Sequence, residues 1–314
     1  MMSEQPDTLV MLATYNEAQN VEIIYTMIRN LVPEVDILFV DDNSPDGTGK
    51  IIQKLKKTDP KVFSLNRSEK LGVGSAHRDG ITWAYENHYR SLITMDCDLA
   101  HAPQKLPEFL SLHPEADIVV GTRFQGTESL PGWSIHRRFM THTGHYLTKF
   151  LLRMPYDATG AYRRYNLSTI SEGFLSRVEA NGYAFFYESL HVLHVNGFQI
   201  KEIPLVLLAR TYGESKMSFI DVINGFLYLI RQATKDRLRK THLLLQPNIA
   251  NQPEDWDKYW LKKEPNKISS WYDIVAKFYR RFIIRPSLNR ALKRTFQPGQ
   301  SILHAGCGSG MVDS

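Results

Sequence analysis

Short apolar segments alternate with segments of helical periodicity along the first part of the chain. The segments "TLVMLA" at 8–13 and "DILFVD" at 36–41 are rich in β-forming residues, and about 20 residues separate them. The residues between them carry apolar side chains at the spacing of one helix face: Val21, Ile24, Ile28 and Leu31. Because the period changes from that of a strand to that of a helix and back, the pattern predicts a β-α-β unit.

The same alternation continues as far as residue 124. We expect helices near 47–57, 73–87 and 103–112, and strands at 62–65, 91–95 and 116–124. Strands that alternate with helices at this interval are typical of an α/β fold, in which a mostly parallel sheet carries helices on both faces. Ligands bind such sheets at the carboxyl ends of the strands. The charged residues expected at or just beyond those ends are Asp41, Asp42, Asp96, Asp98 and Arg123.

The character of the chain changes after about residue 240. Residues 241–256 have the Pro, Asn and Gln content of a linker, and residues 257–314 read as aromatic-rich amphipathic helices followed by a strand and a turn. The sequence therefore predicts three parts: an α/β domain at 1–240, a linker at 241–256, and a partial, largely helical extension at 257–314.

Composition narrows the class of protein. The 314 residues are 43% apolar and 23% charged, which is typical of a soluble globular protein. Two distant cysteines, Cys97 and Cys307, suit a reducing compartment. Neither a signal peptide nor an apolar run of 18 residues is found, so we expect a cytoplasmic protein that does not span a membrane. The net charge of +5 permits an anionic partner without identifying one.

Two aspartates end the apolar run "LITMDCDLAH". Asp96 and Asp98 are two positions apart on an extended chain, so their side chains point the same way, about 7 Å from each other. Each carboxylate raises the cost of ionising the other unless a cation lies nearby. Two aspartates at this spacing more often mark the polar end of a strand than a metal site. Other motifs in the chain are needed to distinguish the two interpretations.

Eight segments occur in an order that resembles a known family. They are "ATYNE", "VDDNSPDGT", "LGVGSAHRDG", "MDCDLAH", "GTRF", "GWSIHRRF", "DATGAYRRY" and "RTYGESK". Together they resemble the family 2 glycosyltransferases of GT-A fold, specifically the dolichyl-phosphate or polyprenyl-phosphate mannose synthases. The resemblance covers about residues 8–235.

This resemblance implies a fold and an activity. The fold would be the GT-A form of a Rossmann-like sheet, and the protein would be a metal-dependent, inverting hexosyltransferase using Mg²⁺ or Mn²⁺. It would transfer mannose from GDP-mannose to a polyprenyl or dolichyl phosphate, and no nucleic acid partner is expected. Two alternatives stay open: a UDP-glucose-dependent glucosyltransferase acting on the same lipid, and an impaired module that only binds nucleotide sugars.

The resemblance also assigns residues to the donor. Tyr15 would stack on the base, Glu17 and Asp42 would accept hydrogen bonds from ribose and base, and Asp96 and Asp98 would bind the metal. Further residues of the nucleotide and metal pocket would be Ala13, Val40, Cys97 and Ala100. Two of these depart from the family pattern, which has Pro at the position of Ala13 and Gln at that of Ala100. The missing Gln predicts a weaker metal site.

The acceptor side is assigned in the same way. Arg123, Arg137 and Thr141 would bind the lipid phosphate, and Arg210 and Lys216 would lie on a loop that closes over the donor phosphates. Asp98, Arg123, Arg137 and Arg210 would carry the catalysis. A phosphate monoester is already anionic at neutral pH, so the reaction needs no general base, and positioning and charge neutralisation have to supply the rate.

Two amphipathic segments concern the membrane. Residues 144–154 and 217–240 both combine apolar stripes with basic residues, which suits helices that lie on an anionic membrane surface, although ordinary core packing is the simpler explanation for each helix taken separately. We expect a peripheral protein at the cytoplasmic face of a membrane.

The final segment "ILHAGCGSG", at 302–310, resembles the first motif of S-adenosylmethionine-dependent methyltransferases. A glycine-rich turn serves many nucleotides, so the motif by itself is weak. Only four residues follow it. We therefore expect residues 257–314 to be the start of a methyltransferase-like domain, without methyltransferase activity.

Overall fold

The computed structural model describes residues 7–125, 130–133, 135–207, 219–238 and 243–245. Residues 1–245 form one compact unit, to which all the described residues belong. The predictions for 246–314, including the methyltransferase-like segment, lie outside the described residues, as do those for Arg210 and Lys216.

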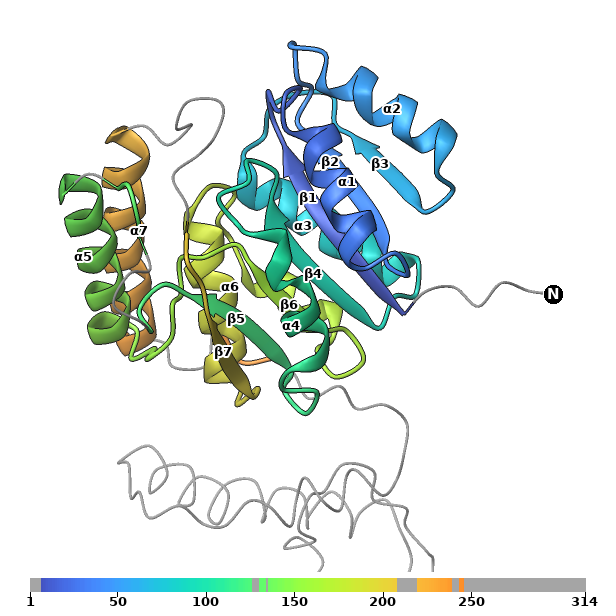
Figure 1. Cartoon of the computed structure of the whole chain (residues 1–314). Coiled ribbons are helices and arrows are strands. Elements are labelled where there is room, and N and C mark those ends of the chain that lie inside the picture. Colours follow the sequence, from blue (N-terminus) through green and yellow to red (C-terminus); the bar gives the residue numbers. More distant parts are fainter. Residues whose placement is uncertain (1–6, 126–129, 134, 208–218, 239–242, 246–314) are drawn as a thin grey trace, which may run out of the picture. The chain divides into compact units, whose positions relative to one another are not determined.

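A seven-stranded sheet forms the centre of this unit, in the order β3-β2-β1-β4-β6-β5-β7 (Figure 1). The strands are β1 Thr8–Thr14, β2 Asp36–Asp41, β3 Val62–Asn66, β4 Ser91–Asp96, β5 Ile118–Thr122, β6 Arg163–Asn166 and β7 Ile200–Pro204. All neighbouring strands are parallel except β6, which is antiparallel to both β4 and β5. The predicted mostly parallel sheet is confirmed.

Helices cover both faces of the sheet. They are α1 Val21–Leu31, α2 Thr48–Thr58, α3 Val73–Glu86, α4 Leu106–Ser111, α5 Ile135–Leu151, α6 Ala184–Val195 and α7 Phe219–Leu238, with short 3₁₀ helices η1 Pro103–Lys105 and η2 Glu172–Arg177. Alternate residues of one strand enter different cores: Leu9 and Met11 of β1 pack with residues of α3 and α6, while Val10 and Leu12 pack with residues of α1 and α4. This explains why the strands are apolar throughout rather than alternating.

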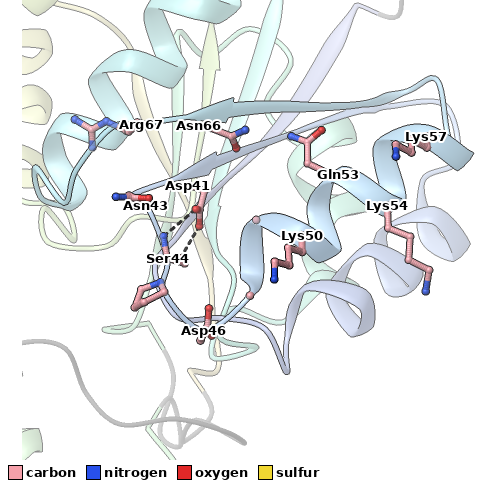
Figure 2. A pocket seen from close by; sticks show the side chains of 13 residues that line it. Asp41, Asn43, Ser44, Asp46, Lys50, Gln53, Lys54, Lys57, Asn66 and Arg67 are labelled. Carbon is pink, nitrogen blue, oxygen red and sulfur yellow. Dashed lines mark hydrogen bonds between the residues drawn. The ribbon is translucent and has the colours of Figure 1, made fainter.

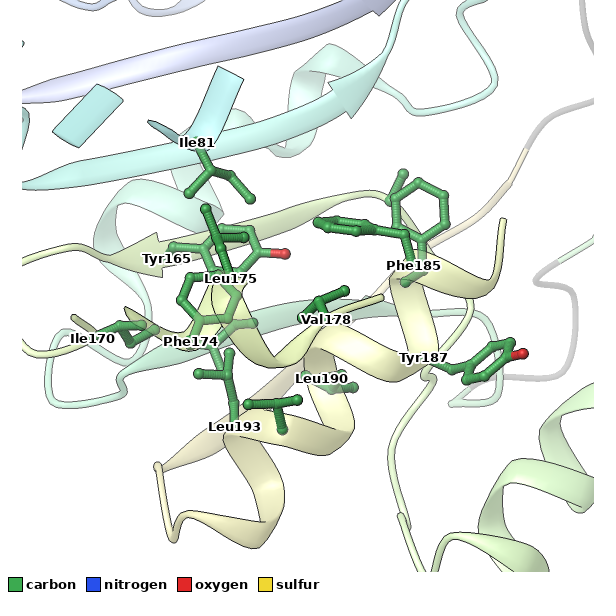
Figure 3. Close-up of a cluster of buried hydrophobic side chains, with 14 of the residues drawn as sticks. Ile81, Tyr165, Ile170, Phe174, Leu175, Val178, Phe185, Tyr187, Leu190 and Leu193 are labelled. Carbon is green, nitrogen blue, oxygen red and sulfur yellow. The ribbon is translucent and has the colours of Figure 1, made fainter. Parts of the chain in front are cut away.

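The first of these cores is large and aromatic. Figure 3 shows Ile81 of α3 above Tyr165 of β6, with Phe174 and Leu175 of η2 beside them and Leu190 of α6 below. All five side chains are at most 6% exposed. The antiparallel strand β6 and the segment that follows it are therefore fixed to the sheet by an extensive apolar contact.

Several boundaries differ from the sequence prediction. The helix expected at 103–112 is split into η1 and α4, and the strand expected at 116–124 is only Ile118–Thr122. The helix expected at 144–154 begins nine residues earlier, at Ile135. Leu31, placed on the buried face of α1, is 36% exposed. The strands β6 and β7 and the helix α6 were not predicted.

Strand β6 escaped prediction because its first two residues are arginines. Arg163 is completely buried, and its guanidinium donates to the carbonyls of Ala158, Gly160 and Phe186 and to the hydroxyl of Ser189. Arg164 donates to the carbonyl oxygens at the end of α4, which have no partner within the helix: Phe109, Leu112 and His113. Because most of these acceptors, from Phe109 to Ser189, are distant in sequence, the local sequence does not mark the segment as a strand.

Gly74 of α3 offers a direct test of the packing between α3 and α6. A Cβ atom at this position would lie 2.5 Å from the carbonyl oxygen of Gly182 and 2.5 Å from Cβ of Phe185, whereas a Cβ at Gly144 of α5 would have no atom within 4 Å. We expect Gly74→Ala to lower the free energy of unfolding by about 1–3 kcal/mol through overpacking. Gly144→Ala should raise it by roughly 0.5–1 kcal/mol, because alanine favours the helix. Urea unfolding of both variants checks this, and a stable Gly74→Ala variant would show that the two segments can separate freely.

Candidate active site

One row of residues crosses three strands at the carboxyl edge of the sheet. Ala13 of β1 is paired in register with Val40 of β2 on one side and with Asp96 of β4 on the other. The side chain of Val40 is completely buried in the core, so this residue can meet a ligand only through its backbone. Its carbonyl oxygen accepts a hydrogen bond from the Thr14 hydroxyl at 3.3 Å. The row therefore brings three of the predicted donor residues to one level.

The loop after β1 carries two more of the predicted donor residues, Tyr15 and Glu17. Tyr15 is half-buried, and the Nζ atom of Lys70 lies 4.1 Å from the centre of its ring. Glu17 is buried: its backbone N–H donates to the Thr48 hydroxyl at 2.9 Å, and its carboxylate accepts from the Asn20 amide at 2.6 Å. The Glu17 side chain thus holds the start of α1, in addition to the ligand contact expected of it.

Asp42 is held by a network that the sequence did not indicate. Its carboxylate is buried, forms an ion pair with Arg67, and accepts a bond from the Gly72 N–H at 3.2 Å. The Nε of Arg67 is 3.0 Å from the exposed carboxylate of Asp79. Asp42 therefore faces the segment after β3, and any nucleotide that reaches it also meets Arg67.

The segment after β4 brings both predicted metal ligands to the same edge. The Asp96 side chain is 37% exposed, whereas Asp98 is 3% exposed and accepts a bond from the Ala100 N–H at 3.0 Å. Leu99, between Asp98 and Ala100, has a φ of 62°, in the left-handed region, which turns the chain sharply. His101 Nδ1 accepts from the Asp96 N–H at 2.9 Å, so its 3.6 Å approach to the Asp96 carboxylate is not a salt bridge.

These two carboxylates fit a hard divalent cation. Mg²⁺ is commonly held by one or two carboxylates together with waters and substrate phosphates. The described residues contain no group of three or more His, Cys, Asp or Glu placed to hold a metal. The protein would thus supply only two carboxylate ligands to the metal, and the substrate phosphates and water would have to complete its coordination.

Cys97 and Ala100 lie beside these carboxylates but are buried. The Cys97 side chain is 2% exposed and packs in the core beneath α1 and α4. The Ala100 methyl group forms a small apolar cluster with Leu130 and Leu207, against which Trp133 packs. A glutamine, which the family pattern has at this position, would bring a polar amide into this apolar cluster. The alanine instead packs within it.

Arg123 follows β5 and is clamped by a buried carboxylate. Its Nε and Nη2 atoms are 2.8 and 2.6 Å from the two oxygens of Asp157, its backbone N–H donates to the same carboxylate, and Nη2 also donates to the Thr159 hydroxyl. Burial alone would raise the pKa of Asp157, but the Arg123 guanidinium and its hydrogen bonds hold that pKa below the ordinary value. The negative charge of Asp96 also acts on Arg123 and helps to raise its pKa.

Helix α5 packs against this arginine through Phe124. The Phe124 ring stacks on His145 with their centres 3.9 Å apart, and His142 meets it edge-on at 5.4 Å. Burial lowers the pKa of His145, so its imidazole is neutral near pH 7. Thr141, one turn before His145, is half-buried. Arg137 is also on α5, but its side chain is not among those that the structure describes.

Sequence reasoning missed the residues that orient the site. Asp157 and Thr159 were quoted within "DATGAYRRY" without a role, and Arg67 and His145 were not considered. Asp157 could have been singled out, because a charged residue that precedes Thr and Gly in a matched motif suggests a fixed loop. No local signal identifies Arg67 or His145, whose partners Asp42 and Phe124 are more than 20 residues away.

Comparison with known proteins gives a consistent result. The family model described as "Glycosyl transferase family 2" matches residues 9–180. The chain is 33% identical over 234 residues to a polyprenol monophosphomannose synthase from Mycolicibacterium smegmatis, covering 74% of this chain and 88% of the relative. It is 35% identical over 211 residues to an undecaprenyl-phosphate mannosyltransferase from Micrococcus luteus, covering 67% and 87%.

A solved structure supports the fold. Glucosyl-3-phosphoglycerate synthase from Mycobacterium tuberculosis superposes with a TM-score of 0.53 at 15% identity, over 72% of this chain and 80% of that one. At this level of identity the likeness concerns the fold alone, and it agrees with the GT-A architecture expected from the sequence. By its matching domain, its relatives and its sheet, the chain belongs to glycosyltransferase family 2 and is a glycosyltransferase of GT-A fold.

Proposed function

We propose that the chain transfers mannose from GDP-mannose to a polyprenyl phosphate, with inversion at the anomeric carbon and with the help of Mg²⁺ or Mn²⁺. The observation that carries this proposal is the placement of two carboxylates, Asp96 and Asp98, on the same edge of the sheet as the clamped guanidinium of Arg123. The reaction needs both kinds of charge. The carboxylates would bind a cation that holds the anionic leaving group, and the arginine would bind the anionic nucleophile.

The relatives support the choice of sugar and lipid. Both curated relatives are named as mannose-transferring enzymes, and their names specify polyprenol and undecaprenyl phosphate as acceptors. GDP-mannose is inferred from the motif resemblance, in particular from "DDNSPDGT" and "YGESK". A UDP-glucose-dependent glucosyltransferase is the second candidate, because Tyr15, Asp42 and Arg67 could accept either base.

On the donor side, we assign the base and ribose to Tyr15, Glu17 and Asp42, and the pocket walls to Ala13, Ala100 and the backbone of Val40 and Cys97. Asp96 and Asp98 would hold the cation, which on binding would neutralise the diphosphate and ease its departure. Arg210 and Lys216, which lie outside the described residues, are assigned to the donor phosphates.

On the acceptor side, we assign the lipid phosphate to Arg123, Arg137 and Thr141. A phosphate oxygen forms a bond to C1 of the sugar while the bond from C1 to the diphosphate oxygen breaks and its electron pair leaves with the nucleotide. No proton has to be removed from the nucleophile. Arg123 contributes a fixed orientation, because Asp157 and Thr159 hold its Nε and Nη2 atoms, and among the described residues its Nη1 has no hydrogen-bond partner.

The experiment offers radiolabelled GDP-mannose and UDP-glucose, separately, with a polyprenyl phosphate and Mn²⁺, and measures the label that enters the organic phase. We expect label from GDP-mannose only, and none after addition of EDTA. Label from UDP-glucose alone would establish the second candidate. Nucleotide binding without transfer from either donor would instead indicate a module that only binds nucleotide sugars.

We also infer that helices α5 and α7 touch the membrane that holds the lipid acceptor. The structure describes no helix long and apolar enough to span a bilayer. The two helices contact each other (Figure 1) and expose large apolar side chains. On α5 these are Ile135, Phe139, Tyr146 and Phe150, which are 65–87% exposed, and on α7 they are Ile223, Phe226, Leu227 and Ile230. Large exposed apolar surfaces mark sites of interaction.

Substitution of both aromatic residues tests this contact. Phe139→Ser with Phe150→Ser should weaken binding to vesicles of phosphatidylglycerol and phosphatidylcholine by about tenfold or more, because two exposed rings would no longer enter the bilayer surface. Ile23→Ser with Leu112→Ser removes two exposed apolar side chains from other parts of the surface and should leave binding unchanged. Vesicle sedimentation measures both. Equal binding by the two double variants would exclude α5 as the membrane contact.

A further inference from the structure

A basic groove lies between α2 and the end of β3, beside the proposed donor site, with which it shares Arg67 (Figure 2). It has a volume of about 750 Å³. One wall carries Lys50, Lys54 and Lys57, at the i, i+4 and i+7 positions of α2, and the other carries Asn66 of β3. Gln53 of α2 lies between the two walls and donates to the Ser64 hydroxyl at 3.0 Å. Residues at these helical spacings share one face, so three ammonium groups line the same groove.

The basic groups of this groove outnumber its carboxylates. Within the described part of the chain, Lys50 and Lys57 form no ion pair, and Lys54 approaches only the exposed Glu22, at 3.3 Å. The lining holds two carboxylates, Asp41 and Asp46, against the four basic groups of Lys50, Lys54, Lys57 and Arg67. Asp41 accepts bonds from Thr14 and Ser44, while Asp46 accepts bonds from Thr48 and the Ala18 N–H. The groove therefore keeps an excess of positive charge.

The floor of the groove is held in place before any ligand arrives. Ser44 accepts a bond from the Asn16 N–H at 3.0 Å and donates to Asp41 at 2.6 Å, and Asp46 caps the first turn of α2 through Thr48. Gly49, which has no side chain, keeps the start of α2 open above Asp41. A preformed site loses less conformational entropy on binding.

The lining determines which anion would fit. No aromatic side chain lines the groove and Pro45 is its only carbon-rich member, so neither a base nor an acyl chain would find a partner there. Lys50 and Lys57 are separated by about 10 Å along the helix axis, a distance that one phosphate group cannot span. The geometry points to a second anion site, centred on the lysines of α2 beside the donor site, that binds a short inorganic oligophosphate such as triphosphate.

A membrane surface is a poorer occupant. Helix α2 covers the β3 edge of the sheet, whereas α5 and α7, which expose the large apolar side chains, lie at the other end of this unit (Figure 1). A membrane that contacts α5 and α7 would therefore not reach the groove. The ligand is better sought among soluble anions.

Isothermal titration of the full chain with inorganic triphosphate tests the site. The titration contains EDTA and low salt, so that a metal-dependent donor site does not contribute. We expect wild type to bind and Lys50→Gln with Lys57→Gln to bind at least tenfold more weakly. A matched control, Lys56→Gln with Lys201→Gln, removes the same charge from exposed positions outside the groove and should bind as wild type does. Asp98→Asn should also bind normally.

Three results would overturn this site. One is the absence of binding to wild type. Another is equal weakening in both double variants, which would indicate only a general charge effect. The third is tighter binding in Asp98→Asn: in the absence of metal, removal of this carboxylate would strengthen binding of triphosphate at the donor site. None of these measurements depends on sugar transfer, so the outcome is independent of the proposed function.

Discussion

Asp157→Asn should lower the free energy of unfolding by about 3–5 kcal/mol, because it leaves the Arg123 guanidinium buried without its counter-charge. Arg123 is 12% exposed and Asp157 is completely buried, so water cannot replace the lost carboxylate. An asparagine side chain offers one acceptor where the carboxylate accepts bonds from Nε, Nη2 and the backbone N–H. The same change should lower kcat/KM for the lipid phosphate by roughly 100-fold, since a displaced arginine misplaces the acceptor.

Asp59→Asn is a matched control for this variant. The Arg29–Asp59 pair has a short contact of 2.6 Å, but both side chains are 15% exposed and both are far from the carboxyl edge of the sheet. We expect a smaller loss of stability and no change in acceptor kinetics. Urea unfolding and steady-state kinetics with varied lipid phosphate measure both. If Asp157→Asn proved as mild as Asp59→Asn, the clamp would not position Arg123.

The effect of Asp157 should also depend on pH in a defined direction. Its pKa is lower in the folded protein than in the unfolded chain, so its stabilisation is fully present above the unfolded pKa, about 4. The stabilisation is lost as the pH falls through the folded pKa. The difference in unfolding free energy between wild type and Asp157→Asn should therefore be constant from pH 5 to 7 and shrink below about pH 4.

Asp98→Asn should abolish most of the Mn²⁺-dependent affinity for GDP, by about 100-fold or more, because a neutral amide is a much weaker ligand for a hard cation. The fold should be retained, since the amide oxygen can still accept the bond from the Ala100 N–H that the Asp98 carboxylate now accepts. Calorimetry with GDP in the presence and absence of Mn²⁺ separates the metal-dependent part of binding.

Asp36→Asn provides the comparison for this second variant. Asp36 is also a buried aspartate at a strand end, but it begins β2 and accepts a hydrogen bond from Tyr89 at the opposite edge of the sheet. GDP affinity should be unchanged in Asp36→Asn. An Asp98→Asn variant that bound GDP and Mn²⁺ like wild type would remove Asp98 from the metal site.

The first four strands and the helices between them could be predicted because their signals are local. The apolar period of α1 predicted the buried positions Val21, Ile24 and Ile28, and the runs that form β1, β2 and β4 are apolar along their length. Because ligands bind α/β sheets at the carboxyl ends of the strands, the sequence also predicted that Asp42, Asp96 and Asp98 lie at one edge of the sheet. The ordered motifs predicted the family, which the family model and the curated relatives confirm.

Only the tertiary structure decided how the site is held. Arg163 and Arg164 form part of a buried strand because carbonyl groups from distant segments accept their hydrogen bonds, and no pattern in "RRYN" encodes those acceptors. Arg123 could be recognised as a phosphate ligand from its motif, but its orientation depends on Asp157, 34 residues later. Short-range periodicity records which face of an element is apolar, whereas the pairing of buried charges depends on which segments meet. The chain's sequence therefore determined its elements and its chemistry, and folding alone determined the partners that fix that chemistry in place.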